Sequence, residues 1–220
     1  MGGEFSNRPT ESGGRHTRIK ATDFDLSREI QFSPSEGVTS FRDSRLVIFD
    51  ANAIGLLRQN LIDTLGKETA REFLLRFGYQ NGFSDFLQIK LNYDFESESE
   101  LLASGPVIHT FEGLVRATPQ EIRFDRTTGD FYFTDVWHNS YEAEQHLSFQ
   151  HADDSPVCWT LMGYASGWCT AFFEKPLLAI EPVCRGKGDD HCEWEIKPVT
   201  EWGNQAQPYT KALEEFWRRY

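Results

Sequence analysis

Two cysteines near the C-terminal end of this chain flank a glycine-rich segment, an arrangement that can present two sulfur ligands to one metal ion. Cys184 and Cys192 are separated by the seven residues Arg-Gly-Lys-Gly-Asp-Asp-His, which favour a turn. This separation is wider than the roughly two to four residues typical of zinc knuckles. A third thiol, Cys158, lies upstream. From spacing alone, a zinc site and ordinary buried thiols beside a surface turn are equally good interpretations.

Two further side chains could contact a small molecule, although each also fits an ordinary protein core. His109 follows Pro-Val-Ile, and Trp137 follows Thr-Asp-Val. A lone histidine or tryptophan in an apolar run is more typical of a buried residue whose polar atom finds an internal partner. Cys169 lies eleven residues after Cys158, which is about 16 Å along a continuous helix. We therefore expect Cys169 to lie outside any metal site that contains Cys158.

The sequence does not indicate catalysis. It contains neither a phosphate-binding Walker loop nor a Gly-x-Ser-x-Gly nucleophile motif. Ser166 lies in an amphipathic helical pattern, where a serine would be buried and not presented to a substrate. Acidic runs such as 96–100 and 189–190 are typical of solvated loops. We expect that the chain is not an enzyme.

The composition indicates a soluble protein with one core, or with a core and a small accessory unit. The chain has 220 residues, of which 39% are hydrophobic, and a net charge of −12. This charge disfavours contact with nucleic acid, which requires a basic surface. No apolar run approaches the length of a membrane span, so no membrane contact is expected. Four cysteines without a secretory segment predict the reducing cytoplasm.

The periodicity of apolar residues predicts helices and hairpin strands. Helical spacing covers residues 52–65, with Gly66 expected to end this helix. The predicted fold is α/β (α+β), an antiparallel sheet with packed helices, because the strands lie in hairpins and not in βαβ units. Residues 94–100 are expected to form a loop and 127–130 a hairpin turn. Further helices are predicted at 67–86, 141–150, 156–173 (with Pro156 in the first turn) and 202–220, and strands at 45–49, 107–116, 121–124, 131–137, 177–183 and 191–196.

Six segments carry a resemblance to a known family. They are residues 24–27, 73–82, 105–113, 156–165, 184–192 and 197–203. In this order they resemble the N-terminal sensor domain of aromatic-responsive, sigma-54-dependent bacterial activators, the XylR/DmpR/MopR group. The resemblance covers about residues 22–205 and implies a 4-vinyl-reductase-like sensor fold. Val38-Thr-Ser-Phe-Arg differs from the usual Gly-Lys-Ile-Trp-type segment, and Lys187 stands where some members carry an additional cysteine.

The resemblance implies a structural zinc site. In this family, zinc is held by one cysteine of the long helix and by a glutamate and two cysteines of the hairpin. The matching residues here are Cys158, Glu181, Cys184 and Cys192. Three thiolates and one carboxylate would complete a tetrahedral shell with no position for water. His191 is the best substitute ligand, although an exposed turn histidine is the simpler interpretation.

The resemblance also implies a buried pocket for a small aromatic effector. In phenol-responsive members a histidine and a tryptophan bind the ligand hydroxyl, and His109 and Trp137 stand at these positions. Members that respond to hydrocarbons without a hydroxyl tend to lack the histidine, so His109 favours a phenol-like effector. Further wall residues implied by the same matching are Leu102, Tyr164, Trp168 and Ala179.

As a whole, the resemblance implies a cytoplasmic, homodimeric sensor of a transcriptional activator. Domains C-terminal to it would bind DNA and the sigma-54 polymerase. Two other classes stay open. A zinc-containing enzyme acting on small aromatics would turn over the bound ring, and a structural interaction module would bind no aromatic. The expected organisation is a disordered leader (1–20), an N-terminal dimerisation segment (21–50), a zinc-containing aromatic-sensor domain (51–205) and a linker helix (206–220).

Overall fold

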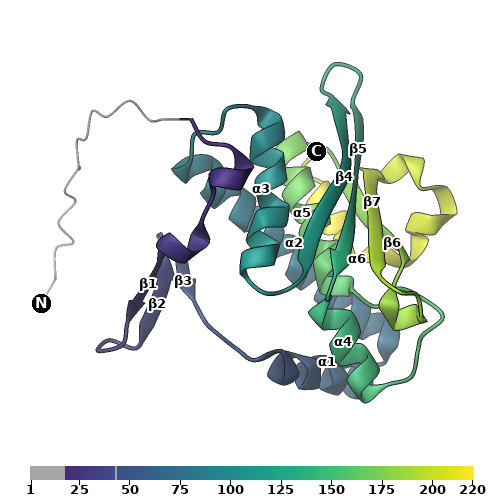
Figure 1. Ribbon diagram of the computed structural model, residues 1–220. Coiled ribbons are helices and arrows are strands. Elements are labelled where there is room, and N and C mark those ends of the chain that lie inside the picture. Colours follow the sequence, from purple (N-terminus) through teal and green to yellow (C-terminus); the bar gives the residue numbers. More distant parts are fainter. Residues whose placement is uncertain (1–17, 43) are drawn as a thin grey trace, which may run out of the picture.

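The computed structural model describes residues 18–42 and 44–220, so most of the expected leader lies outside the described residues. The described chain is a mixed α/β fold with two antiparallel sheets and six α-helices (Figure 1). None of these helices has the length and apolar character needed to cross a membrane. The helices are α1 (Ala51–Leu65), α2 (Lys67–Asn92), α3 (Glu98–Phe111), α4 (Tyr141–Phe149), α5 (Trp159–Phe173) and α6 (Gln207–Trp217), and the strands are β1 (Ile30–Ser33), β2 (Val38–Phe41), β3 (Ser44–Leu46), β4 (Arg116–Asp125), β5 (Asp130–His138), β6 (Leu177–Val183) and β7 (Cys192–Pro198).

The larger sheet places two separate hairpins side by side. Its strand order is β4-β5-β7-β6, and each neighbouring pair is antiparallel. The turn after Asp125 joins β4 to β5, as expected from the Thr-Thr-Gly-Asp sequence. Pairing of β5 with β7 sets Trp137 opposite Cys192 and Asp135 opposite Trp194. Residues distant in the sequence are thus brought to one region of the sheet.

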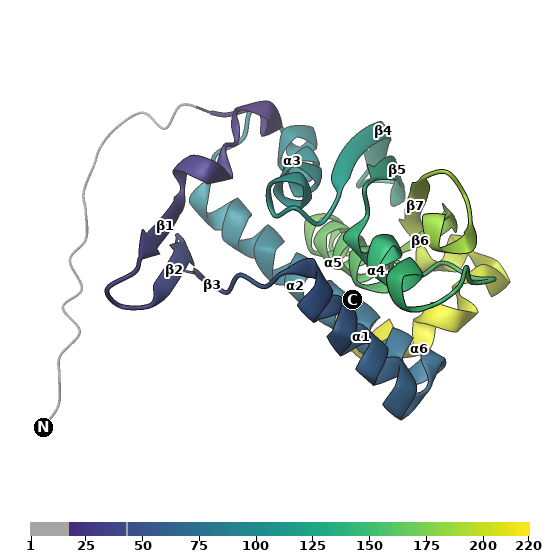
Figure 2. The same cartoon turned by 60° about the horizontal axis from the view of Figure 1, so that its bottom comes forward.

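Helices cover one face of this sheet in two layers. Figure 1 shows α3 and α5 beside the strands, with α2 behind α5, and Figure 2 shows α1 and α2 lying along each other beneath the sheet. The principal core lies between α5, α3 and the inward face of β5, where Phe131, Phe133 and Trp137 are buried at alternate positions. On the far side of α2, the helix α6 buries Leu213 and Trp217 in a second cluster.

The contact between α2 and α5 depends on glycines in both helices. A Cβ atom on Gly78 or Gly82 of α2 would lie 2.0–2.2 Å from carbonyl oxygens of α5. In the reverse direction, a Cβ atom on Gly163 or Gly167 would lie 2.0–2.2 Å from carbonyl oxygens of α2. Such distances are far below van der Waals contact, so the two backbones pack directly against each other. This contact fixes α5, whose 15 residues are almost all buried.

Helix α3 is the main difference from the sequence prediction. Residues 107–116 were expected to form a strand, but Val107–Phe111 belong to α3 and only Arg116 begins β4. The helix starts inside the expected acidic loop, where the Ser97 hydroxyl accepts a hydrogen bond from the backbone N–H of Glu100. This N-cap, together with acidic residues in the first turn, stabilises a helix start. The cap outweighs the β-branched character of the segment that follows.

The other predicted elements agree more closely with the structure. Helix α1 ends at Gly66, which has a positive φ of 81°, and α2 extends six residues beyond the predicted end at Phe86. Pro156 does not lie in the first turn of α5, because the helix begins at Trp159 with Cys158 as its N-cap. The expected helix over 202–220 is divided into two short 3₁₀ turns and α6.

The glycine contact generates a prediction about stability. Replacing Gly163 by alanine would place a Cβ atom 2.2 Å from the carbonyl oxygen of Leu75, a backbone atom that cannot rotate away. We expect Gly163→Ala to lower the free energy of unfolding by about 1–3 kcal/mol or more. Ser84→Ala on the exposed side of α2 is the control, with an expected change within about 0.5 kcal/mol. Chemical denaturation measures both; equal stabilities for the two variants would contradict direct backbone packing.

Candidate metal centre and aromatic-lined pocket

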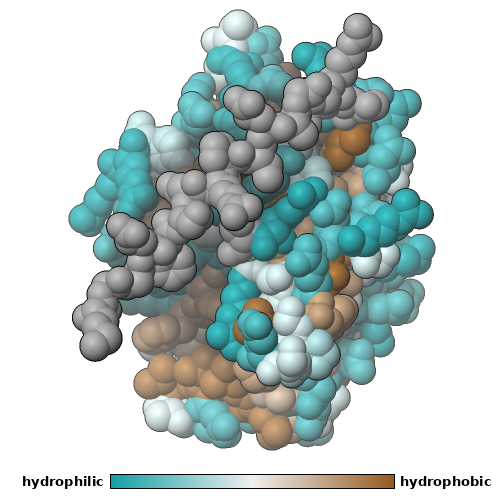
Figure 3. All heavy atoms as spheres, turned by 90° about the vertical axis from the view of Figure 1, so that its left-hand side faces the viewer, coloured by the Kyte–Doolittle hydropathy of each residue, from teal (hydrophilic) through white to brown (hydrophobic). Residues whose placement is uncertain are grey.

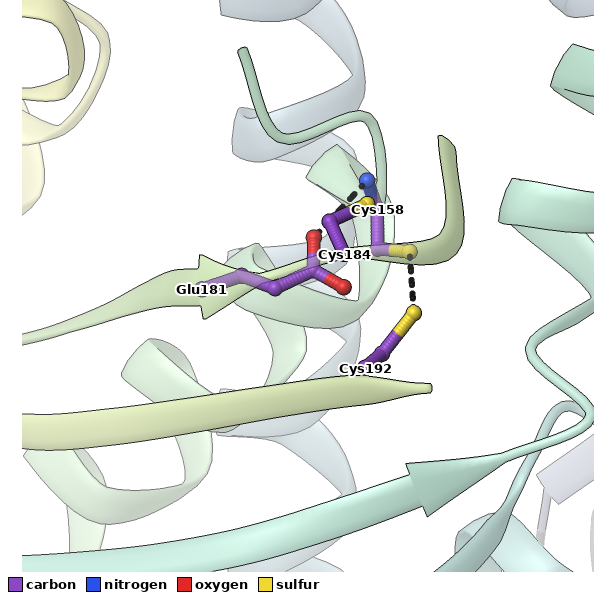
Figure 4. A group of neighbouring side chains, drawn as sticks. All are labelled: Cys158, Glu181, Cys184 and Cys192. Atoms are coloured by element: carbon purple, nitrogen blue, oxygen red, sulfur yellow. Dashed lines mark hydrogen bonds between the residues drawn. The ribbon is translucent and has the colours of Figure 1, made fainter. Parts of the chain in front are cut away.

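Four metal-ligating side chains meet beside the start of α5. The ligand atoms of Cys158, Glu181, Cys184 and Cys192 all lie within 4.8 Å of one another, and all four residues are fully buried (Figure 4). Cys158 directly precedes α5, Glu181 lies near the end of β6, Cys184 directly follows β6, and Cys192 is the first residue of β7. The structure therefore brings together the four residues that the resemblance implied.

Local backbone geometry explains how Glu181 joins this cluster. Pairing between β6 and β7 shifts register between Ile180 and Val183. A bulge of this kind re-aims a side chain that regular alternation would point to the other face. The turn beyond β6 is held by Asp189, whose carboxylate accepts a hydrogen bond of 2.8 Å from the backbone N–H of Cys184. Cys184 and Cys192 can therefore face each other despite their wide separation.

Hydrogen bonds satisfy only part of the cluster. The backbone N–H of Cys158 donates to Glu181 Oε2 at 3.3 Å, and the N–H of Arg185 donates to Cys192 Sγ at 3.4 Å. Glu181 Oε1 is buried and has no partner within the described residues. A buried oxygen without a partner is costly, which points to a group that this carboxylate would bind.

The electrostatics of the cluster favour a cation. Burial raises the pKa of the Cys158 thiol and of the Glu181 carboxyl, because each would otherwise carry an uncompensated charge. Within the described chain, no lysine or arginine forms an ion pair with Glu181. Three thiols and one carboxyl without a basic partner fit a divalent metal ion such as zinc.

The two other candidate ligands lie outside this cluster. Helix α5 is continuous from Trp159 to Phe173, so Cys169 is carried away from Cys158, as expected. Cys169 lines a separate cavity. His191 is part-exposed, and its Nε2 atom lies 3.6 Å from a carboxylate oxygen of Glu193. The donor set in the structure is therefore three sulfurs and one carboxylate.

The cavity lies between α3, α5 and the inward face of the sheet. Four of the six residues expected in its wall line it, namely His109, Trp137, Tyr164 and Trp168. The other lining residues are Gly105, Pro106, Ala117, Phe133, Asp135, Ala165, Cys169 and Trp194.

Leu102 and Ala179, also expected in this wall, do not line the cavity. Leu102 is fully buried in the principal core. Its carbonyl oxygen, not its side chain, faces a pocket residue, because it accepts a hydrogen bond from the Trp168 indole. Ala179 lies in β6, where its backbone N–H donates to the Ser166 hydroxyl at 2.9 Å. Both residues therefore support the elements around the cavity from positions outside its wall.

Gly105 and Pro106 together form the seat of Trp168. A Cβ atom on Gly105 would lie 2.8–3.0 Å from the indole ring, so only glycine lets this ring lie against α3. Pro106 has no N–H to donate to the carbonyl oxygen of Leu102, four residues earlier. That oxygen accepts the indole N–H of Trp168 instead, at 3.2 Å. The Gly-Pro pair thus exchanges one helical hydrogen bond for a fixed wall of the cavity.

Polar groups of this cavity include three buried atoms without partners. Within the described residues, His109 Nε2, Asp135 Oδ2 and Trp194 Nε1 have no hydrogen-bond partner. Asp135 is fully buried, and its other oxygen accepts the backbone N–H of Thr118 at 2.7 Å. The Tyr164 hydroxyl, in contrast, donates to Asp85 Oδ2 at 3.0 Å. The cavity is therefore apolar in its walls and polar at a few points.

Burial makes these polar groups neutral. It lowers the pKa of His109 to about 3, so the imidazole carries no charge near pH 7. It raises the pKa of Asp135 to about 8, against the opposing effect of the hydrogen bond from Thr118. A neutral imidazole and a protonated carboxyl can each donate or accept one hydrogen bond. The cavity thus suits an uncharged ligand with hydroxyl groups.

Asp135 and Trp194 were not predicted from the sequence. The alternation of Phe131, Phe133 and Trp137 on one face of β5 would have identified Asp135 as an acidic residue on an apolar face. Trp194 gave no comparable signal, because its contribution depends on the pairing of β7 with β5.

The room left inside the cavity is small. It offers about 20 Å³ to the centre of a water-sized sphere, which is close to the space that one water molecule requires. An aromatic ring would therefore have to displace side chains of the wall. The stacked pair Tyr164 and Trp168, with ring centroids 6.2 Å apart, and the ring of His109, 3.9 Å from Tyr164, are the groups closest to such a movement.

Comparison with known proteins places the chain among regulators of aromatic degradation. A family model described as "Activator of aromatic catabolism" matches residues 25–125, and a second model, for the 4-vinyl-reductase-type domain, matches residues 137–198. The phenol regulator MopR of Acinetobacter guillouiae is 35% identical over 82% of this chain, and the transcriptional regulatory protein XylR of Pseudomonas putida is 31% identical over 82%. The chain spans about a third of the length of these two relatives (32% each).

A solved structure agrees with this placement. The phenol-responsive sensory domain of the transcription activator PoxR, determined with phenol, superposes with a TM-score of 0.79 and 32% sequence identity. The match covers 86% of this chain and 94% of that domain. Fold and sequence thus agree over nearly the whole of an effector-binding domain.

Proposed function

This chain belongs to the family of activators of aromatic catabolism, within the region of their sensory domain, and we propose that it is the ligand-sensing domain of a transcriptional activator that binds a phenol-like effector. The observation that carries this proposal is the neutral, buried His109, whose Nε2 atom lacks a partner among the described residues and lies inside an aromatic-lined cavity. Trp137 lines the same cavity. A phenolic hydroxyl between these two side chains would supply the missing hydrogen bond.

The proposed role of the metal is structural. Zinc held by Cys158, Glu181, Cys184 and Cys192 would have four protein ligands and no open position for a substrate. Its binding would tie the start of α5 to β6 and β7, the elements that carry or adjoin these ligands. Because the site would lack an open position, we propose a sensor and not a zinc-dependent enzyme. Turnover of a bound ring would favour the enzyme, and an absence of aromatic binding would favour a structural module.

Zinc removal is expected to destabilise the domain. Cys184→Ala or Cys158→Ala should yield protein with less than one zinc per chain and a free energy of unfolding lower by several kcal/mol, on the order of a lost structural ligand. Cys169→Ala removes an equally buried thiol outside the cluster and should keep the metal. Elemental analysis and thermal unfolding of the three variants test this. Well-folded wild-type protein without stoichiometric zinc would contradict it.

The phenol proposal makes a prediction for His109→Ala. Deleting the imidazole would leave the ligand hydroxyl buried with one partner missing. We expect the affinity for phenol to fall about five- to a hundred-fold, or about 1–3 kcal/mol. Toluene has a similar ring without a hydroxyl, so its affinity should be little changed. Calorimetry of both ligands on both proteins measures the difference, and equal losses for phenol and toluene would show that His109 only shapes the cavity.

We further propose that the N-terminal segment forms a homodimer. The three-stranded sheet β1-β2-β3 lies beside the main body and leads into an extended connection to α1 (Figures 1 and 2). Hydrophobic side chains are exposed along it: Phe32 (64%), Val47, Ile48 (73%) and Phe49 (64%). Figure 3 shows hydrophobic surface gathered on the lower part of this side. Contiguous apolar surface of this kind is typical of an interaction site.

Charged substitutions should weaken this dimer. The double variant Ile48→Asp, Phe49→Asp is expected to raise the dimer dissociation constant about tenfold or more, because desolvated charges oppose burial. Phe111→Asp changes an exposed aromatic residue (46%) at the end of α3 and serves as the matched control. Analytical ultracentrifugation over a concentration series measures both. If only the control dissociates, the interface lies on another face.

A further inference from the structure

Asp135 and Trp194 form a polar pair inside the cavity that the proposed contact with one phenolic hydroxyl does not use. The two residues are directly opposite each other in the pairing of β5 with β7. Both side chains are buried and line the cavity, and Asp135 Oδ2 and Trp194 Nε1 both lack partners within the described chain. We call Asp135 and Trp194 the second polar subsite.

The second polar subsite is separate from the proposed hydroxyl site but close to it. Asp135 and Trp137 point to the same face of β5, since both line the cavity and are two residues apart. Two residues along a strand correspond to about 7 Å. His109 approaches from α3, on the opposite side of the cavity. A single substituted benzene ring can therefore reach both places.

The geometry of Asp135 indicates a ligand contact more than a structural one. Its Oδ1 atom already accepts the N–H of Thr118 at 2.7 Å, which fixes the orientation of the carboxyl group. The remaining oxygen is thus held in place without a partner in the described part of the chain. A buried carboxyl in an apolar wall is unfavourable unless something binds it. Among the described residues that line the cavity there is no lysine or arginine, so the missing partner is not a basic side chain of this wall.

A hydroxyl group is the ligand group that fits the second polar subsite best. It can accept a hydrogen bond from a protonated carboxyl or from the indole N–H, and it can donate to an ionised carboxylate. It therefore suits Asp135 in either protonation state. A ligand carboxylate would bring a second acidic group beside Asp135, and a methyl or chloro substituent would leave both protein atoms unpaired.

We propose that the second polar subsite selects aromatic effectors that carry a second hydroxyl group, so that dihydroxybenzenes bind better than phenol. This inference rests on the proposed binding of a first hydroxyl at His109 and Trp137. In this arrangement Asp135 is a specificity-determining residue, and Trp194 completes the contact. The effector class is then a ring with two hydroxyls and no charge.

The test is calorimetry of phenol and of the three dihydroxybenzenes, catechol, resorcinol and hydroquinone. On wild-type protein, at least one isomer should bind about tenfold or more tightly than phenol, because a site built to pair a hydroxyl discriminates against a ligand that lacks it. Asp135→Leu has a similar shape without polar atoms, and should reduce this ratio to about one. Asp135→Asn keeps hydrogen-bonding capacity and should retain most of the preference. Cys169→Ala, in the same wall, should change both affinities by a similar factor.

The outcomes separate this inference from the proposed function. Wild-type protein that binds phenol, but prefers no dihydroxybenzene, overturns the inference and leaves the phenol proposal intact; a water molecule alone would then occupy the second polar subsite. This result needs no variant, so it is decisive even if Asp135→Leu does not fold. A preference that persists unchanged in Asp135→Leu also overturns it. Wild-type protein that binds none of the four rings overturns the proposed function itself.

Discussion

The direct backbone contact between α2 and α5 is the constraint on which the rest of this structure depends. Glycines on both helices permit it, because any side chain there would meet a carbonyl oxygen at about 2 Å. The contact fixes the position of α5 beneath the sheet. Cys158 then lies at its N-terminus, beside the hairpin cysteines, and Tyr164 and Trp168 lie further along, on the wall of the cavity. One rigid helix thus aligns two sites of different chemistry.

The metal cluster and the cavity also share the strand pair β5–β7. Cys192 belongs to the cluster and Trp194, two residues later, lines the cavity. Their partners across the sheet are Trp137 and Asp135, which line the same cavity. A metal bound at Cys192 would therefore fix the register of the strands that form the polar part of the cavity. This is a physical reason for a structural metal next to a ligand site, without any contact between metal and ligand.

Much of this arrangement could be predicted from residue types and spacing, and the failures have clear causes. The hairpin sequences and the helical period of α1, α2, α4 and α5 identified most elements, and the family resemblance identified the four residues that form the buried cluster. The segment 107–111 was predicted wrongly because a helix cap at Ser97 outweighed local β propensity. Asp135 was missed because its role depends on strand pairing and on burial, which no local pattern expresses.

The small size of the cavity connects ligand binding with a change in the domain. An aromatic ring cannot enter the space of about 20 Å³ unless wall side chains move. Trp168 is held by Gly105 and by the carbonyl oxygen of Leu102 in α3, and Tyr164 by Asp85 in α2. Because α5 is fixed against α2 by direct backbone contact, it cannot easily yield to the ring. Movement would therefore pass to α3, whose contact with Trp168 consists of a single hydrogen bond and ring packing. Helix α3 leads directly into β4 at the edge of the sheet, so occupation of the cavity would be transmitted to this edge strand.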